Sequence, residues 1–176
     1  MELNDRFKNT QKVYGELTGS LLESVPATDD FCAAAIKIHL IFERLLLKII
    51  EDIAENPEHL HKAKLSFAQL ISIAQLLLSK PDKELFALMS QLNKIRNKLA
   101  HVIDESEAKG LAKDLVAKCR VIDDSNSETP ASLVELLVCS SLMMLGRLES
   151  HAVHDLLWKD KSLTNSYSRQ AAKHER

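Results

Sequence analysis

The chain has 176 residues, which is enough for one domain that buries a hydrophobic core without disulfides or metal ions. Its content of 45% hydrophobic and 27% charged residues is ordinary for a soluble globular protein. The formal net charge of −2 argues against broad electrostatic adhesion to nucleic acid, so any contact with RNA or a nucleotide must be local.

Long tracts rich in Leu, Ile, Ala, Lys and Glu predict an all-α fold, a bundle of about five or six helices. Only four Gly and four Pro interrupt these tracts. The first helix is expected over residues 3–24, and Pro26 follows as a break. The second, over residues 30–55, is the most hydrophobic and is expected at the centre of the bundle, with the helix that ends at His101 packed against it.

Two polar residues, His39 and Glu43, lie inside the apolar arc of this second helix. They are four residues apart and therefore share one face. An unpaired charge at such a place is costly, so Glu43 is expected to have a partner. In one interpretation the two residues form a structural pair, within the helix or at the edge of the packed surface. In the other, Glu43 reaches Arg96 or His101 on the neighbouring helix.

The later helices are expected to begin at capping residues. Ser66 is the expected N-cap of a short helix, and Asp82 is that of the next. Asp104, with Glu107 three residues on, predicts a capping box that opens a further helix. Thr129–Pro130 predicts the start of a long last helix, because Pro is favoured at the first helical position.

Residues 1–158 are predicted to form a single domain, and residues 159–176 a polar, flexible C-terminal tail. A polar N-terminus without an apolar segment, and three dispersed cysteines, predict a cytoplasmic protein without a signal peptide. The longest apolar run, residues 133–148, is too short and too charged to span a membrane. The histidines at 59–61 and 151–155 are weak metal-ligand patterns, so no metal and no cofactor are expected.

The helix that ends at His101 carries the residues with the clearest chemical role. Apolar positions in steps of three and four mark its buried face: Leu85, Leu88, Leu92, Ile95, Leu99 and Val102. At about 100° per residue, Asn97 points nearly opposite this face, with Lys94 and His101 beside it. Arg96 lies on the flank, where its head can reach outward. Lys94, Arg96 and Lys98 form a local basic cluster that can contact a phosphate.

Arg96-Asn97 followed by three residues and His101 resembles the R-x4-6-H signature of the HEPN superfamily (higher eukaryotes and prokaryotes nucleotide-binding). In that superfamily the residue after Arg is commonly Asn, and the motif lies late in a helix of an all-α bundle. The run Leu65–Leu70, followed by Asp82–Leu85, is similar to the branch that includes mannitol-operon-repressor-like proteins. The resemblance covers roughly residues 30–150.

The resemblance implies a metal-independent endoribonuclease, often a toxin or host-defence effector, whose two motifs meet across a homodimer interface in one composite cleft. Such cleavage needs a base for the ribose 2′-hydroxyl proton and a cation for the phosphate. An imidazole and a planar guanidinium suit these roles, which assigns them to His101 and Arg96. The residues expected to assist are Asn97 beside the imidazole or the phosphate, Lys94 and Lys98 on the RNA backbone, and Glu43 and His39 in support.

The dimer is expected on the face around Asn93, Asn97 and Ala100, which is polar and carries no bulky side chain. A cognate antitoxin is a further partner implied by the nuclease function. The same branch implies an alternative, a non-catalytic regulatory module that acts through protein or nucleotide binding. No helix-turn-helix is evident, so such regulation would act through a partner protein. The intact Arg–Asn–His pattern favours the nuclease, but such residues also serve dimer interfaces structurally, and both functions stay open.

Overall fold

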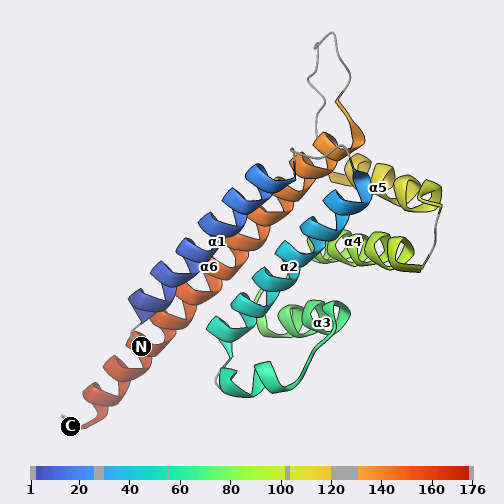
Figure 1. Ribbon diagram of the computed structural model, residues 1–176. Helices are drawn as coiled ribbons and strands as arrows, with labels where there is room; N and C mark the ends of the chain where they lie inside the picture. The colour runs from blue at the N-terminus through green and yellow to red at the C-terminus, as the bar shows by residue number, and fades with distance from the viewer. Residues whose placement is uncertain (1–2, 26–29, 55, 102–103, 120–130, 175–176) are drawn as a thin grey trace.

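The computed structural model describes residues 3–25, 30–54, 56–101, 104–119 and 131–174, and over these residues the chain is helical, with no β-strand. Six α-helices and one short 3₁₀ helix follow one another in this part of the chain (Figure 1). Their bounds are α1 Leu3–Ser24, α2 Phe31–Ile53, η1 Pro57–Lys62, α3 Phe67–Leu77, α4 Lys83–His101, α5 Ser106–Cys119 and α6 Leu133–His174. The prediction of an all-α bundle of five or six helices is confirmed.

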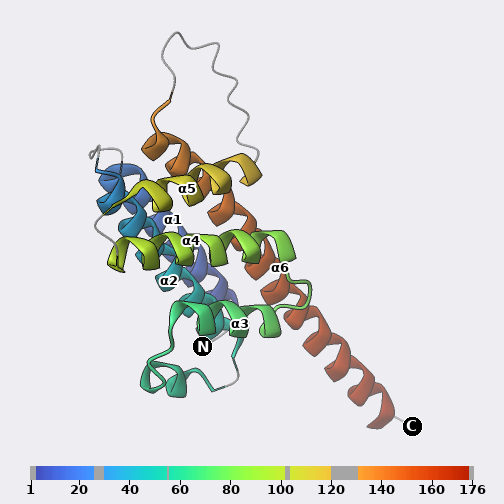
Figure 2. The same ribbon diagram turned by 90° about the vertical axis from the view of Figure 1, so that its right-hand side faces the viewer.

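The helices form two layers (Figures 1 and 2). The long helices α1, α2 and α6 make up the first layer, and each of them contacts the other two. The shorter helices α3, α4 and α5 make up the second layer, where they lie one beside the next and cross the long helices steeply. Because α2 contacts α1, α6, α3 and α4, it is the central helix, and α4 packs against it as predicted.

α2 is central because apolar side chains cover most of its circumference. It begins after Asp30, whose carboxylate accepts a hydrogen bond from the Ala33 N–H at 3.1 Å. Thirteen of its 23 residues are buried, and only packing on several sides removes that much surface from water. One narrow strip, which includes Ile36, Leu40 and Arg44, stays exposed.

Two of the predicted helix starts are confirmed. Ser66 Oγ accepts a hydrogen bond from the Gln69 N–H at 3.4 Å, and the Gln69 side chain accepts one from the Ser66 N–H at 2.8 Å, which makes a capping box. Asp82 accepts a hydrogen bond from the Leu85 N–H at 3.0 Å and so caps α4. Both signals are local, so the sequence was sufficient to locate them.

The predicted capping box at Asp104 and Glu107 is wrong. The Asp104 carboxylate accepts hydrogen bonds from the N–H and the hydroxyl of Ser106, at 3.0 and 2.7 Å, and so closes a turn that precedes the first residue of α5. Glu107 pairs instead with Lys98 of α4, at 2.8 Å. A capping box requires the Glu107 side chain to bond back to the backbone of the cap residue, but Glu107 pairs with Lys98 of the neighbouring helix instead.

α6 extends further than the sequence predicts. A polar tail was expected from residue 159, but the backbone continues as helix to His174. Residues 159–174 contain no Gly or Pro, and a helix that is already nucleated can elongate without an apolar stripe. The expected start at Thr129–Pro130 lies outside the described residues, and Ser132 caps α6 through reciprocal hydrogen bonds with Glu135. Within the described ranges no helix, α6 included, has both the length and the hydropathy to cross a membrane.

A cluster of polar side chains joins the turn between α3 and α4 to α6. Arg147 donates to Asp82 from Nε at 3.0 Å and from Nη2 at 2.6 Å, and it reaches Glu84 at 3.1 Å. The N–H and the hydroxyl of Ser79 donate to Asp155, the N–H at 2.7 Å. Burial alone would raise the pKa of Asp82, but its N-cap hydrogen bond and Arg147 outweigh burial and hold that pKa below its usual value of 3.8.

Asp82→Ala is expected to lower the free energy of unfolding by about 2 kcal/mol, because it removes both the N-cap of α4 and the partner of Arg147. Urea denaturation followed by circular dichroism measures this change. Asp114→Ala, which removes an exposed carboxylate from α5, is the matched control and is expected to shift the same free energy by less than about 0.5 kcal/mol. Equal losses in the two variants would show that Asp82 does not join the layers.

Candidate functional site

α4 carries the Arg–Asn–His motif, and its apolar positions face the core. The fully buried members of the predicted stripe are Leu85, Leu88, Leu92 and Ile95. Arg96, Asn97 and His101 are exposed. The amphipathic pattern is therefore confirmed for these four positions, Leu99 is only partly buried, and Val102 lies outside the described residues.

A cleft of about 390 Å³ lies where α4 meets α2 and the start of α3. Predicted site residues from two helices line it together: His39 and Glu43 of α2, and Arg96 and Asn97 of α4. The lining residues that the sequence did not assign to a catalytic site are Ser66, Phe67, Ala68 and Asn93. The predicted residues that do not line it are Lys94, Lys98 and His101. The spacing of Asn93, three and four residues before Arg96 and Asn97, is the signal that could have found it.

His39 is the most buried polar residue of the cleft, with 5% of its surface exposed. Its Nε2 donates to Asn93 Oδ1 at 3.3 Å, and its ring packs on Phe67 with the ring centroids 4.2 Å apart. Burial lowers the pKa of His39 below its ordinary 6.5, although the Asn93 hydrogen bond and the Glu43 carboxylate act in the opposite direction. His39 is therefore neutral at pH 7, and it joins α2 to α4.

Of the two interpretations of His39 and Glu43, the structure contains the pair within α2. The His39 Nδ1 lies 3.9 Å from the Glu43 Oε2. Over the described residues no ion pair joins Glu43 to Arg96 or His101, although Glu43 and Arg96 line the same cleft. The carboxylate therefore faces the cleft with a neutral imidazole as its neighbour.

Arg96 is the cation at the rim of the cleft. It is exposed, and its Nη1 donates to the Asn97 Oδ1 at 3.2 Å. In the part of the chain that the structure describes no carboxylate pairs with it, so its remaining donors can bind an anion. Lys94 is exposed as well, whereas Lys98 forms an ion pair with Glu107. A phosphate contact from Lys98 requires this surface pair to open, which costs little.

His101 is the last residue of α4 and is exposed. α4 is one continuous helix through both motif residues, so Arg96 and His101, which are five residues apart, point in directions about 140° apart. A single chain therefore does not bring both side chains into one cleft.

The histidines near the C-terminus contact carboxylates. His151 lies 3.5 Å from Asp82, and His154 lies 3.5 Å from Asp155. Among the described residues no group of three or more His, Cys, Asp or Glu side chains is placed to hold a metal ion. These side chains thus contribute to the contacts between α6 and the turn before α4.

No protein-family model, no curated protein and no solved structure matches this chain. The cleft offers an exposed guanidinium and two amides beside a neutral imidazole, and a second imidazole is exposed at the end of the same helix. This set of groups suits the binding of an anion and the transfer of a proton.

Acidification is expected to destabilise the fold through His39. Because its folded-state pKa lies below 6.5, the unfolded chain binds the proton more readily, and stability is lost as the pH falls below about 6.5. His39→Gln, which keeps a donor for Asn93 but does not titrate, is expected to reduce this loss. Urea midpoints at pH 7.5 and pH 5.5 measure it.

His59→Gln is the matched control for this experiment, because His59 is an exposed histidine on η1. It is expected to keep the full wild-type loss of stability between the two pH values. An equally large loss in His39→Gln would show that another group causes the pH dependence.

Proposed function

We propose that the chain is a metal-independent endoribonuclease of the HEPN type, a toxin or host-defence effector that acts as a cytoplasmic homodimer. The observation that best supports the proposal is the exposure of Arg96 and the lack of a carboxylate partner for it within the described residues. Its guanidinium is exposed at the rim of a polar cleft, and within the described residues no carboxylate neutralises it. A guanidinium in this state can bind a phosphate through two parallel hydrogen bonds.

His101 is the acid–base group of the proposed reaction. It takes the proton of a ribose 2′-hydroxyl, and the 2′ oxygen attacks the adjacent phosphorus. The bond from phosphorus to the 5′ oxygen breaks, and that oxygen receives the proton from the imidazolium. Arg96 donates to the phosphate oxygens as negative charge develops on them. The products are a 2′,3′-cyclic phosphate and a 5′-hydroxyl, and no step needs a metal ion.

The other predicted residues assist the two reacting side chains. Asn97 accepts a hydrogen bond from Arg96 and thereby orients the guanidinium. Lys94 adds positive charge beside it for the RNA backbone, and Lys98 does so when it leaves Glu107. His39 is a positioning residue, because it is buried and neutral and fixes α4 on α2.

The reacting pair combines side chains from two subunits. Arg96 and His101 diverge on one helix, so Arg96 of one subunit works with His101 of the partner subunit. A two-fold axis generates two such pairs, each with the same geometry. This arrangement makes activity depend on dimer formation.

An alternative function is a non-catalytic regulatory module, which resembles mannitol-operon-repressor-like proteins and acts through protein or nucleotide binding. It is favoured by the use of two predicted site residues in contacts within the chain, His39 with Asn93 and Lys98 with Glu107. A regulator needs neither residue for chemistry. Such a module would bind its partner through a surface patch, and it would need no side chain that takes part in a reaction.

His101→Ala is expected to lower the rate of RNA cleavage by at least about 100-fold, which is the usual contribution of a general base. Arg96→Lys is expected to lose most of the activity too, because an ammonium keeps the charge but not the fork of donors. Cleavage of a labelled single-stranded RNA in excess EDTA measures both rates, and mass spectrometry of the products should find cyclic phosphate ends. His59→Ala, at another exposed histidine, is the control and is expected to cleave at the wild-type rate.

Both site variants are expected to melt within a few degrees of the wild type, because the two side chains are exposed. If the double variant Arg96→Lys/His101→Ala still cuts RNA at the wild-type rate, the motif is structural. The regulatory alternative then takes the place of the nuclease. The same holds if the purified wild type cuts no RNA.

A further inference from the structure

Glu43 brings to the cleft a half-buried carboxylate that receives no hydrogen bond from the described part of the chain. Its neighbour within α2 is His39, whose Nδ1 lies 3.9 Å from the Glu43 Oε2, a distance too long for a hydrogen bond. The proton of this neutral imidazole is on Nε2, which donates to Asn93, so Nδ1 is an acceptor. Two acceptors therefore face each other, and a donor from a ligand can satisfy the carboxylate.

The α4 side of the cleft offers donors instead. The Oδ1 of Asn97 accepts from Arg96, and the Oδ1 of Asn93 accepts from His39. Each of the two amides keeps an Nδ2 group that donates to no acceptor within the described residues. The cleft is thus divided, with carboxylate acceptors on α2 and amide and guanidinium donors on α4.

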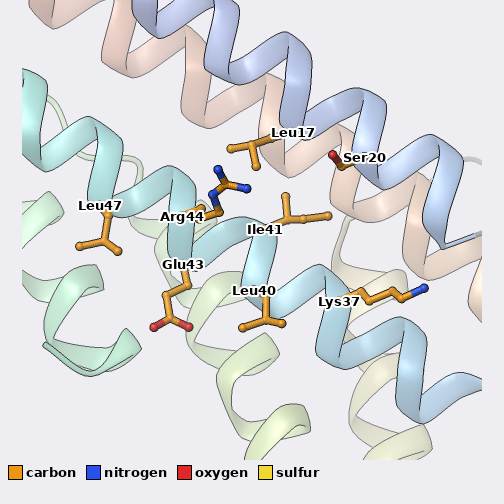
Figure 3. Close-up of a pocket in the computed structure, with 8 residues that line it drawn as sticks. All are labelled: Leu17, Ser20, Lys37, Leu40, Ile41, Glu43, Arg44 and Leu47. Atoms are coloured by element: carbon orange, nitrogen blue, oxygen red, sulfur yellow. The ribbon is translucent and has the colours of Figure 1, made fainter. Parts of the chain in front are cut away.

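The Glu43 carboxylate is directed to this cleft. Glu43 also lines a groove of about 510 Å³ between α1 and α2, to which Leu17, Arg44 and Leu47 contribute (Figure 3). Figure 3 shows Arg44 extended toward α1, while Glu43 projects from α2 on the side away from it. The cleft itself, at about 390 Å³, lies within the range of small-molecule sites, which is roughly 300 to 1,000 Å³. It therefore has room for one nucleotide base.

The division of donors and acceptors favours one base of RNA. The two oxygens of a carboxylate accept two parallel N–H donors. Guanine presents such a pair, N1–H and the N2 amino group, beside the acceptors O6 and N7. Adenine and cytosine present one amino group next to a ring nitrogen that is itself an acceptor, and uracil presents a single N–H between two carbonyls. Only guanine offers both a double donor and neighbouring acceptors.

We propose that the cleft binds the guanine base of a single-stranded RNA and that Glu43 selects this base. Glu43 accepts from N1–H and the N2 amino group, and the amides of Asn93 and Asn97 donate to the acceptors of the base. The base must be unpaired, because pairing would use the same edge. This inference rests on the proposed nuclease function and names its substrate: Arg96, at the rim of the cleft, holds a phosphate next to the bound guanosine, and cleavage occurs there.

The affinity for short RNAs tests the base preference without cleavage. The probes are five-nucleotide RNAs with a central guanosine or a central adenosine among uridines, labelled with fluorescein and carrying 2′-O-methyl riboses that cannot be cut. Fluorescence anisotropy of the full-length protein is expected to give a Kd at least about 10-fold lower for the guanosine RNA, as a bidentate pair provides. Equal affinities, or binding of neither RNA, overturn the proposal.

Glu43→Gln tests the assigned residue. A glutamine replaces one acceptor oxygen by an amino group, so the variant is expected to lose the preference for guanosine while it still binds the adenosine RNA. The matched control is Glu16→Gln, which changes an exposed glutamate of α1 that pairs with Lys12 outside the cleft, and it is expected to keep the full preference. If Glu43→Gln weakens both RNAs alike, Glu43 is structural and does not select the base.

Competition with unlabelled GMP separates RNA from a free nucleotide as the ligand. RNA is expected to bind at least about 10-fold more tightly than GMP, because its further phosphates can contact the exposed Lys94. GMP that binds as tightly as the guanosine RNA would assign the cleft to a free nucleotide and overturn an RNA substrate.

Mapping of the cut sites separates this inference from the function on which it rests. In an RNA of mixed sequence the wild type is expected to cut next to unpaired guanosines, and Glu43→Gln is expected to cut without regard to the base. Cleavage by the wild type without base preference keeps the nuclease and removes the guanine site. Glu43-dependent binding of the guanosine RNA without any cleavage keeps the guanine site and removes the nuclease.

Discussion

The burial of α2 sets the arrangement of the other helices. More than half of its residues are buried, so the helix must be enclosed by both layers of the bundle. Apolar burial is not directional, and it alone would allow neighbouring helices to slide or rotate. The position of α4 against α2 therefore has to be fixed by other contacts, which are polar.

Two amide side chains on opposite flanks of α4 make polar contacts, one with α2 and the other with α5. Asn93 accepts a hydrogen bond from the buried His39 of α2. Gln91 donates to the Leu111 carbonyl of α5 at 2.8 Å and accepts from the Lys118 ammonium at 2.9 Å. Buried polar groups are costly unless they are bonded, so these bonds select one rotation of α4. That rotation leaves Arg96 and Asn97 at the rim of the cleft, and it leaves His101 pointing elsewhere.

The functional proposals follow from the charged side chains that this packing leaves without an ion-pair partner in the described part of the chain. His39, Asp82 and Arg147 have partners within the chain, so their chemistry is used in folding. Arg96, Glu43 and Arg44 keep charge that the described part of the chain does not neutralise, and the first two share a cleft while the last two share a groove. The cleft and the groove thus share α2, with the cleft on its α4 side and the groove on its α1 side.

Features that depend on near neighbours in the chain could be predicted from the residues alone. The helices, the caps at Ser66 and Asp82, and the buried stripe of α4 follow from spacings of three or four residues, which one helix satisfies alone. The capping box predicted at Asp104 and Glu107 is wrong because Glu107 pairs with Lys98 of α4, and the predicted end of the last helix falls short because a helix can continue through polar residues. The packing of the helices was needed to show that Asn93 bonds to His39, 54 residues away, and that Arg147 bonds to Asp82, 65 residues away. Periodicity shows which face of a helix is buried, but it does not show which neighbour buries that face, and the neighbours decide which charges remain free.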